Sequence, residues 1–356
     1  MQTFKKAAVS FISVLLCLAV LFTASFYYSD KFSVATNKEQ CTIPEDTNYI
    51  FCGASQCEMA FIPDEIDRNV NNIKSYNLSV QSIRLCARYE VIKNLILSGK
   101  KIKTVVLELS YDSFERKENH SALSDIVLRS YYKSLLSREY ILKYTYNRYL
   151  VRNEILNFKS FFTYKDGKNS AQSSSESSQT ASTNGSIGYG SQYKDANRGF
   201  VAFESKNVRI AENEIKTDFE SEKYESIILE DNVELVNKIV DLCKDNDVEI
   251  IIAVVPLSDA FIWKHTSLDS FYNYLSDFSK TAGCRFYDFN LLKNRYSVFN
   301  DKESFYNESH LSYVGAKALS KEYCKVINKV NSGEDVCDLF YSSYQEMKAD
   351  SPYMKY

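Results

Sequence analysis

The sequence predicts an α/β fold, a three-layer α/β/α sandwich built on a parallel sheet. Short, continuously apolar runs alternate with segments of helical periodicity. Strands that are apolar on both faces are typical of parallel sheets covered by helices on either side. A third observation is the uncharged stretch of residues 7–26, which is long enough to cross a bilayer and predicts an amino-terminal transmembrane helix.

The individual elements follow from the pattern of apolar residues. The first expected strand, Asn48–Cys52, ends at Gly53, and the strongest strand signal, Val248–Val255, stops at Pro256. The full set of expected strands is 48–52, 73–78, 104–109, 248–255 and 284–289. The expected helices are 82–98, a helix-rich aromatic region 121–162, 232–245, 270–281 and the closing helix 313–330.

The amino terminus predicts the compartment of the protein. Lys5 and Lys6 precede the apolar stretch, and the next basic residue is Lys31. The positive-inside rule therefore places the amino terminus in the cytoplasm and the rest of the chain outside the cell membrane. The competing interpretation is a cleavable signal peptide, which would have a shorter apolar region and a better cleavage site than residues 23–25.

Two parts and one insert are expected. Residues 1–30 form a cytoplasmic tip and a single-pass signal anchor, and residues 31–356 form one extracytoplasmic α/β domain. Within that domain, residues 169–186 contain eight serines and no large apolar side chain. Such a composition predicts a disordered insert.

Composition excludes several classes of protein. The chain has 356 residues, of which 45% are hydrophobic and 25% charged, values that exclude wholesale disorder and a polytopic membrane protein. The formal net charge of −3 gives no electrostatic footprint for nucleic acid. No cysteine or histidine cluster has metal-ligand spacing, so no metal and no cofactor are expected. Cys52, Cys243 and Cys324 lie in apolar runs and are predicted to be buried free thiols.

A candidate nucleophile follows the first strand. The residues Gly53-Ala54-Ser55-Gln56 come directly after it, and sites in parallel α/β sheets form at the carboxyl ends of strands. A serine that opens a helix there would present its hydroxyl at that edge, but it needs a base. The alternative is that Ser55 is a plain helix N-cap.

A candidate base lies at the other end of the domain. The segment 305–315 reads FYNESHLSYVG and is expected to be a polar loop between the last strand and the last helix. This loop returns to the same edge of the sheet, where His310 could accept the proton of the Ser55 hydroxyl. The alternative for a lone loop histidine is surface solvation, which is the interpretation favoured for His120 and His265.

These two ends together resemble the SGNH/GDSL hydrolase superfamily. The resemblance is closest to its membrane-anchored branch in cell-envelope and exopolysaccharide acylation, where D-alanine transfer proteins of teichoic acid synthesis and alginate O-acetylation proteins are related in kind. It spans about 45–112 and 245–325 and implies a flavodoxin-like fold. The motifs that carry it are Gly53-Ala54-Ser55, residues 62–66, Tyr76-Asn77-Leu78-Ser79, Ser110-Tyr111-Asp112, Asn307 through Leu311, and Gly315-Ala316.

The resemblance also implies roles for individual residues. Ser55 corresponds to the nucleophile and His310 to the general base, which later acts as the acid. The N–H of Ser55 and a donor from Ser79 would form the oxyanion hole. Asn77 would position the loop that carries Ser79. Asn307 stands where the superfamily has the aspartate of its Asp-x-x-His motif.

The asparagine is the main departure from the superfamily pattern. An amide can hold the imidazole ring, but it cannot stabilise imidazolium and it can select the wrong tautomer. Two substitutes are open: a Ser–His dyad oriented by a backbone carbonyl, or a carboxylate from Glu308, Glu303 or Asp288.

Three smaller points concern the neighbourhood of Ser55. A Cys–His–Asn site that uses Cys57 is a less favoured alternative, because Cys57 lies two residues past the nucleophile position and would point elsewhere on a helix. Ser79 stands where the superfamily often has glycine, and its side chain would narrow the space for the oxyanion. Gln56 replaces a common histidine beside the nucleophile.

The expected function is that of a membrane-anchored SGNH-like acyl esterase or O-acyltransferase. It would act on acyl groups, most simply acetyl, of a cell-surface polysaccharide through a Ser–His acyl-enzyme. The resemblance implies a multi-spanning membrane acyltransferase as partner. The alternative is a catalytically impaired accessory or scaffold subunit of the same machinery, and a weaker one is a secreted esterase released from its anchor.

Overall fold

A computed structural model defines the fold, and the chain divides into two compact units, 1–39 with 137–182 and 40–136 with 183–356. The α/β domain belongs to the second unit. The predicted insert 169–186 and most of the helix-rich region 121–162 lie outside the described residues. The described residues are 10–14, 16–17, 20, 42–111, 113–115, 132–137, 140, 197–206, 208 and 228–352.

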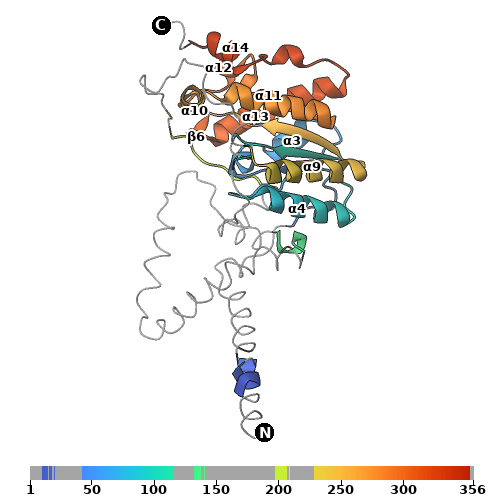
Figure 1. The fold of residues 1–356 in the computed structure, drawn as a ribbon. Helices are drawn as coiled ribbons and strands as arrows, with labels where there is room; N and C mark the ends of the chain where they lie inside the picture. Colours follow the sequence, from blue (N-terminus) through green and yellow to red (C-terminus); the bar gives the residue numbers. More distant parts are fainter. Residues whose placement is uncertain are drawn as a thin grey trace, which may run out of the picture. The chain divides into compact units, whose positions relative to one another are not determined.

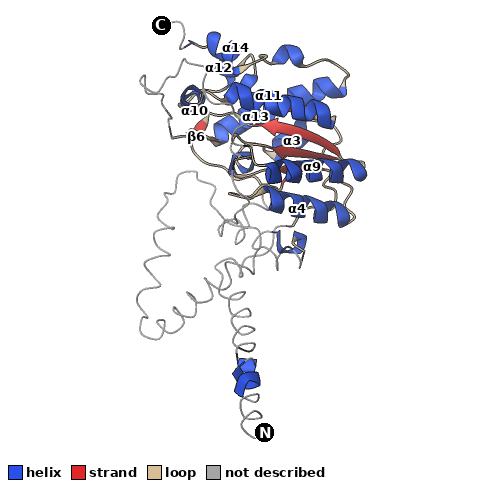
Figure 2. Cartoon of the chain, in the orientation of Figure 1, coloured by secondary structure: helices blue, strands red, loops and turns tan. Residues whose placement is uncertain are grey.

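The centre of the domain is a five-stranded parallel sheet with the order β2-β1-β3-β4-β5 (Figure 2). The predicted α/β class, the parallel sheet and all five predicted strands are confirmed. The strands are β1 (Tyr49–Cys52), β2 (Ser75–Asn77), β3 (Thr104–Glu108), β4 (Glu249–Val254) and β5 (Arg285–Asp288). The chain first moves from β1 to β2 and then crosses to β3 on the other side of β1. The carboxyl ends of β1 and β3 therefore form the switch point at which ligands bind in such sheets.

Helices flank the sheet. The helices α3 (Pro63–Asn69) and α13 (Tyr313–Asn331) pack against each other, as do α4 (Leu85–Leu97) and α9 (Glu230–Asp245) (Figure 1). Helix α11 (Leu268–Ala282) packs beside β5. The four predicted helices 82–98, 232–245, 270–281 and 313–330 are confirmed. Shorter helices are α2 (Ser55–Glu58), α10 (Asp259–Lys264), α12 (Arg295–Val298), α14 (Tyr344–Ala349) and the 3-10 turns η1 (Lys133–Leu135), η6 (Phe289–Leu291) and η7 (Cys337–Leu339).

The segment after the last strand of the sheet differs from the expectation. It was expected to be a polar loop, but it contains an antiparallel hairpin of β6 (Phe305–Asn307) and β7 (His310–Leu311). Strand β6 has three residues and β7 has two, too few to produce an alternating pattern in the sequence. The hairpin is a separate two-stranded sheet, so its position depends on contacts with the rest of the domain.

An aromatic core fixes α13 on the sheet. The ring of Phe51 on β1 stacks on Phe61 with centroids 4.4 Å apart, and Tyr323 of α13 meets both rings edge-on at 5.5 and 5.2 Å. The hydroxyls of Tyr49 and Tyr323 are hydrogen-bonded to each other in the same buried cluster. Because α13 follows directly after β7, this packing also anchors one end of the hairpin.

The three cysteines predicted to be buried free thiols are confirmed as such. Cys52, Cys243 and Cys324 are buried and unpaired with another cysteine. Burial raises the pKa of each of these thiols to about 12, so they are protonated at neutral pH.

The predicted membrane anchor is not settled by the fold. Within the described ranges, no helix is long and apolar enough to span a membrane. Most of residues 7–26 lie outside those ranges, so the anchor stays a prediction.

Candidate functional site

Ser55 is the first residue of α2 and lies just past the carboxyl end of β1. The N-cap of this helix is Ala54, and no side chain caps it, so the alternative reading of Ser55 as a plain N-cap is wrong. The Ser55 side chain is partly exposed at the sheet edge. As the first helical residue, it has a backbone N–H without a partner inside the helix, because such bonds begin only in the next turn.

The turn that presents Ser55 rests on a buried carboxylate. Glu108 is the last residue of β3 and is fully buried, and one of its oxygens accepts the Ala54 N–H at 3.1 Å. Arg88 lies 3.9 Å from this carboxylate and is itself 3% exposed. Gly53 leaves room for the arrangement, because a Cβ there would lie 2.4 Å from both Glu108 Oε2 and Cys57 Cβ. The turn that carries Ser55 is thus built from β1 and β3 together.

Replacing Gly53 by alanine should destabilise the domain by about 3 kcal/mol, the upper part of the usual range for overpacking a core. The new methyl group meets a buried carboxylate and a helix atom, neither of which can move away freely. Urea unfolding at equilibrium measures the loss. Gly333→Ala is the control: its φ is +77° and a Cβ there meets nothing within 4 Å, so only the left-handed backbone costs energy. Equal losses in the two variants would contradict this account of the turn.

His310 reaches Ser55 from the hairpin. Its Nε2 lies 2.8 Å from the Ser55 Oγ, although the two residues are 255 positions apart in the chain. Ser312 caps α13 by accepting the Gly315 N–H at 3.3 Å. Gly315 is required because a Cβ there would lie 2.0 Å from the Ser304 carbonyl oxygen. The segment after His310 therefore turns tightly into α13 and holds the imidazole at the sheet edge.

Asn307 orients the ring of His310. The Asn307 Oδ1 lies 2.8 Å from His310 Nδ1, and the same oxygen accepts the backbone N–H of Ser309 at 3.0 Å. A backbone N–H can only donate, so the amide atom that faces the ring is the carbonyl oxygen. His310 Nδ1 must then carry the proton, which leaves Nε2 as the acceptor for the Ser55 hydroxyl. The Ser309 hydroxyl also lies 3.1 Å from Nδ1, but the closer Asn307 oxygen requires Nδ1 to donate, so the contacts favour the tautomer that Ser55 needs.

The carboxylates proposed as substitutes for Asn307 are engaged elsewhere or point outward. Glu308 pairs with Lys264 at 2.6 Å. Asp288 is buried and accepts from the Tyr344 hydroxyl at 2.8 Å, and burial raises its pKa to about 6. Glu303 is exposed. Among the side chains proposed to orient the ring, Asn307 is the one that the structure places on His310.

Two other expectations about side chains near the site can be compared with the structure. Cys57 is fully buried, and burial raises the pKa of its thiol well above its usual value, so a Cys57 nucleophile is not supported. His265 was expected to be solvated, but it is half-buried and stacks on Phe261 with centroids 3.8 Å apart. Its position four residues after Phe261 brings the two rings onto one side of α10. His120 lies outside the described residues.

Asn77 and Ser79 lie in the loop after β2. The Asn77 amide donates to the carbonyls of Cys57 and Phe61 at 2.9 and 3.1 Å, and its oxygen accepts the Ser79 N–H at 3.2 Å. Asn77 therefore ties this loop to α2 and to the residues that follow it. Ser79 is fully buried and its N–H is bound by the Asn77 oxygen. This arrangement does not present Ser79 as an oxyanion donor, which corrects the expectation.

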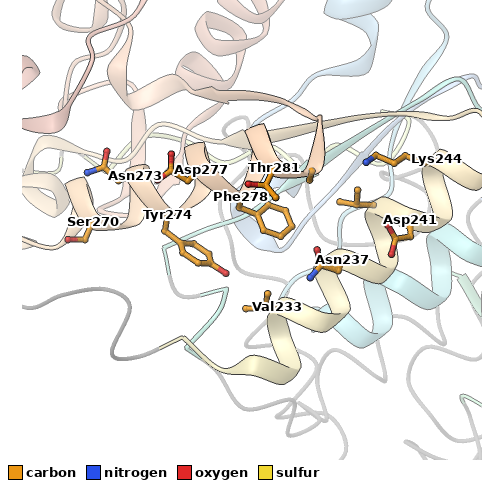
Figure 3. A pocket seen from close by; sticks show the side chains of 12 residues that line it. Val233, Asn237, Asp241, Lys244, Ser270, Asn273, Tyr274, Asp277, Phe278 and Thr281 are labelled. Carbon is orange, nitrogen blue, oxygen red and sulfur yellow. The ribbon is translucent and has the colours of Figure 1, made fainter.

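A groove lies elsewhere on the domain, between α9 and α11, with a volume of about 830 Å³ (Figure 3). Val233, Asn237 and Asp241 of α9 face Tyr274 and Phe278 of α11 across it. None of the predicted site residues lines it. The hydrogen-bonded series of Ser55, His310 and Asn307 is therefore the better candidate for chemistry.

A scan against protein-family models finds no match for this chain, and a search of curated proteins finds none either. The fold and the site define the class of this protein. It is an α/β protein with a serine, a histidine and an asparagine in hydrogen-bonded series at the carboxyl edge of a parallel sheet.

Two residues that support the site were missed by the sequence analysis. Ser309 pins the Asn307 amide through its backbone N–H, which no side-chain pattern reveals. Glu108 supports the turn that carries Ser55, and the sequence contains a signal for it: a carboxylate follows three apolar residues at the end of the strand TVVLE.

Proposed function

We propose that this protein is a membrane-anchored SGNH-like acyl esterase or O-acyltransferase that acts on acetyl or other acyl groups of a cell-surface polysaccharide. The observation that carries the proposal is the series from Ser55 Oγ to His310 Nε2 and from His310 Nδ1 to Asn307 Oδ1, with both distances at 2.8 Å. This is the arrangement in which a serine hydroxyl is activated by a base that a third group orients. The resemblance to SGNH hydrolases rests on the same residues.

The proposed reaction begins with attack of the Ser55 oxygen on the acyl carbonyl carbon. The serine proton passes to His310 Nε2, and the N–H of Ser55 stabilises the oxyanion of the tetrahedral intermediate. His310 then gives this proton to the departing oxygen, which leaves as an alcohol, and an acyl-Ser55 ester remains. Water or a sugar hydroxyl attacks that ester after losing its proton to His310, and Ser55 is released with the proton restored.

A serine-reactive fluorophosphonate tests this proposal directly. The full chain should be labelled covalently, and Ser55→Ala should abolish the label while the protein stays folded by circular dichroism. A folded wild-type protein that is not labelled would contradict the proposed enzyme.

One observation favours the second candidate, an accessory subunit. The group that orients His310 is the neutral amide of Asn307, which cannot stabilise imidazolium by charge. As an accessory subunit, the domain would bind the glycan or act as a scaffold for a multi-spanning membrane acyltransferase. A folded, unlabelled protein that binds acetylated polysaccharide would support this alternative.

The proposed location is the outer face of the cell membrane, with residues 7–26 retained as an anchor. The uncharged stretch and the two lysines before it support this topology. Protease added to intact cells or spheroplasts should digest a carboxy-terminal epitope tag, whereas a cytoplasmic marker protein should survive. Full protection of the tag would contradict the topology.

A further inference from the structure

Residues 197–206, here called the strap, begin at the edge of the sheet. The Arg198 carbonyl accepts the Asn77 N–H at 2.8 Å, and the Arg198 guanidinium forms an ion pair with the Asp67 carboxylate. Gly199 has φ +89° and lies so close to β2 that a Cβ would be 1.8 Å from the Asn77 carbonyl oxygen. The start of the strap is therefore fixed on β2 by backbone contact as well as by charge.

The middle of the strap is attached to the helix that carries the nucleophile. The Val201 N–H donates to the carbonyl of Glu58, the last residue of α2, at 3.1 Å. Phe200 and Ala202 are buried in a small cluster with Ala316 of α13. This part of the chain thus joins the end of α2 to the beginning of α13.

The far end of the strap holds the hairpin that carries His310. The Phe203 carbonyl accepts the Tyr313 N–H at 2.7 Å, and the Lys206 N–H donates to the Phe305 carbonyl at 3.1 Å. The rings of Phe203 and Tyr306 pack with their centroids 4.6 Å apart. The strap therefore contacts the first strand of the hairpin, β6, and the first residue of α13, which follows just after β7.

We propose that the strap is a positioning element that sets the contact between Ser55 and His310. The hairpin is not part of the five-stranded sheet, so no ladder of the main sheet fixes the distance from His310 to α2. The strap bridges the two through their backbones. A displacement of about 1 Å between a nucleophile and its base can lower the reaction rate on the order of a hundredfold. The inference rests on the proposed function only where its test uses activity.

The decisive variant is Gly199→Ala, which forces the strap away from Asn77 at a point that carries no catalytic group. Gly99→Ala is the matched control, because Gly99 has a similar φ of +83° and a Cβ there meets nothing within 4 Å. Both variants bear the cost of a left-handed alanine, and only the first moves the strap. Arg198→Met is a milder second variant that removes the ion pair with Asp67 and introduces no clash.

The first readout does not require activity. The full chain contains three histidines, so the ring resonances of His310 in protein labelled with [13C]histidine can be assigned from His310→Ala. Ser55→Ala should shift the His310 resonances in the wild-type and Gly99→Ala backgrounds. In the Gly199→Ala background this shift should be lost, and with Arg198→Met it should be reduced. Thermal unfolding shows that each variant is folded at the temperature of measurement.

The second readout is kinetic. Gly199→Ala should lower kcat on p-nitrophenyl acetate by about 10- to 100-fold with KM little changed, whereas Gly99→Ala should keep kcat within about twofold. A His310 shift on Ser55→Ala that is as large with Gly199→Ala as in the wild type would overturn the strap proposal. If the His310 shifts on Ser55→Ala change with the strap variants as expected, but the wild type has neither esterase activity nor fluorophosphonate labelling, the strap proposal stands and the proposed function fails.

Discussion

Ser55→Ala and His310→Ala should each lower kcat/KM for a small acetyl ester by about 10⁴- to 10⁶-fold, because the two residues act as one unit. In the proposed reaction, Ser55 supplies the attacking oxygen, and His310 Nε2, 2.8 Å away, accepts its proton. For the same reason, the double variant should be no slower than either single variant by more than about threefold.

Initial rates on p-nitrophenyl acetate for the wild type and the three variants provide the measurement. His265→Ala is a matched control, because that ring stacks on Phe261 and takes no part in the series with Ser55. Its kcat/KM should remain within about threefold of the wild type. Retention of full activity by His310→Ala would show that the Ser55–His310 assignment is wrong.

The main sheet could be predicted from the sequence because β1, β2 and β3 are buried along their whole length and β4 along all but its first residue. Val105, Val106 and Leu107 of β3 are at most 1% exposed, and a run of apolar residues is the direct consequence of burial on both faces. The closing helix was equally predictable, because its buried positions recur with helical spacing. These elements bring Ser55 and His310 to one edge, which explains why both were found without a structure.

The contacts that position the site residues could not be predicted, because each of them involves a backbone group. The Ser309 N–H decides which atom of Asn307 faces the ring, and the Phe203 carbonyl holds the first residue of α13. The donor of the first contact and both partners of the second are backbone atoms, which every residue type except proline supplies. Ser79 was misassigned for a related reason: the neighbouring Asn77 oxygen binds its N–H, and the sequence does not show that the bond exists.

The geometry around Asn307 changes the expected effect of restoring a carboxylate there. Replacing the orienting aspartate by asparagine costs a serine protease roughly ten-thousand-fold, chiefly because the amide selects the wrong histidine tautomer. In this protein, the Ser309 N–H already holds the amide oxygen toward His310 Nδ1. The contacts therefore favour the required tautomer with asparagine, and the contribution missing from the proposed reaction is the negative charge that would stabilise imidazolium.

Asn307→Asp should accordingly raise kcat/KM for a small acetyl ester by about 10-fold, and by no more than about 30-fold. A hydrogen bond to a charged partner is worth about 1–2 kcal/mol more than a neutral one, which corresponds to this range. The acid limb of the pH–rate profile should move to higher pH, because the carboxylate favours protonated His310. Asn307→Ala, which removes the oxygen from Nδ1, should lower kcat/KM by about a hundredfold, within the range for a general base that is no longer oriented.

The size of the gain distinguishes the possible roles of the amide. A gain near ten-thousand-fold would mean that the tautomer is wrong in the native protein and that the Ser309 N–H does not control the amide. Unchanged activity in both Asn307→Asp and Asn307→Ala would mean that another group orients His310. If the native protein and Asn307→Asp are both folded and inactive, the accessory-subunit alternative is favoured. If Asn307→Asp alone is active, Ser55 and His310 are competent for catalysis, and the neutral Asn307 amide is the reason that the native protein is inactive.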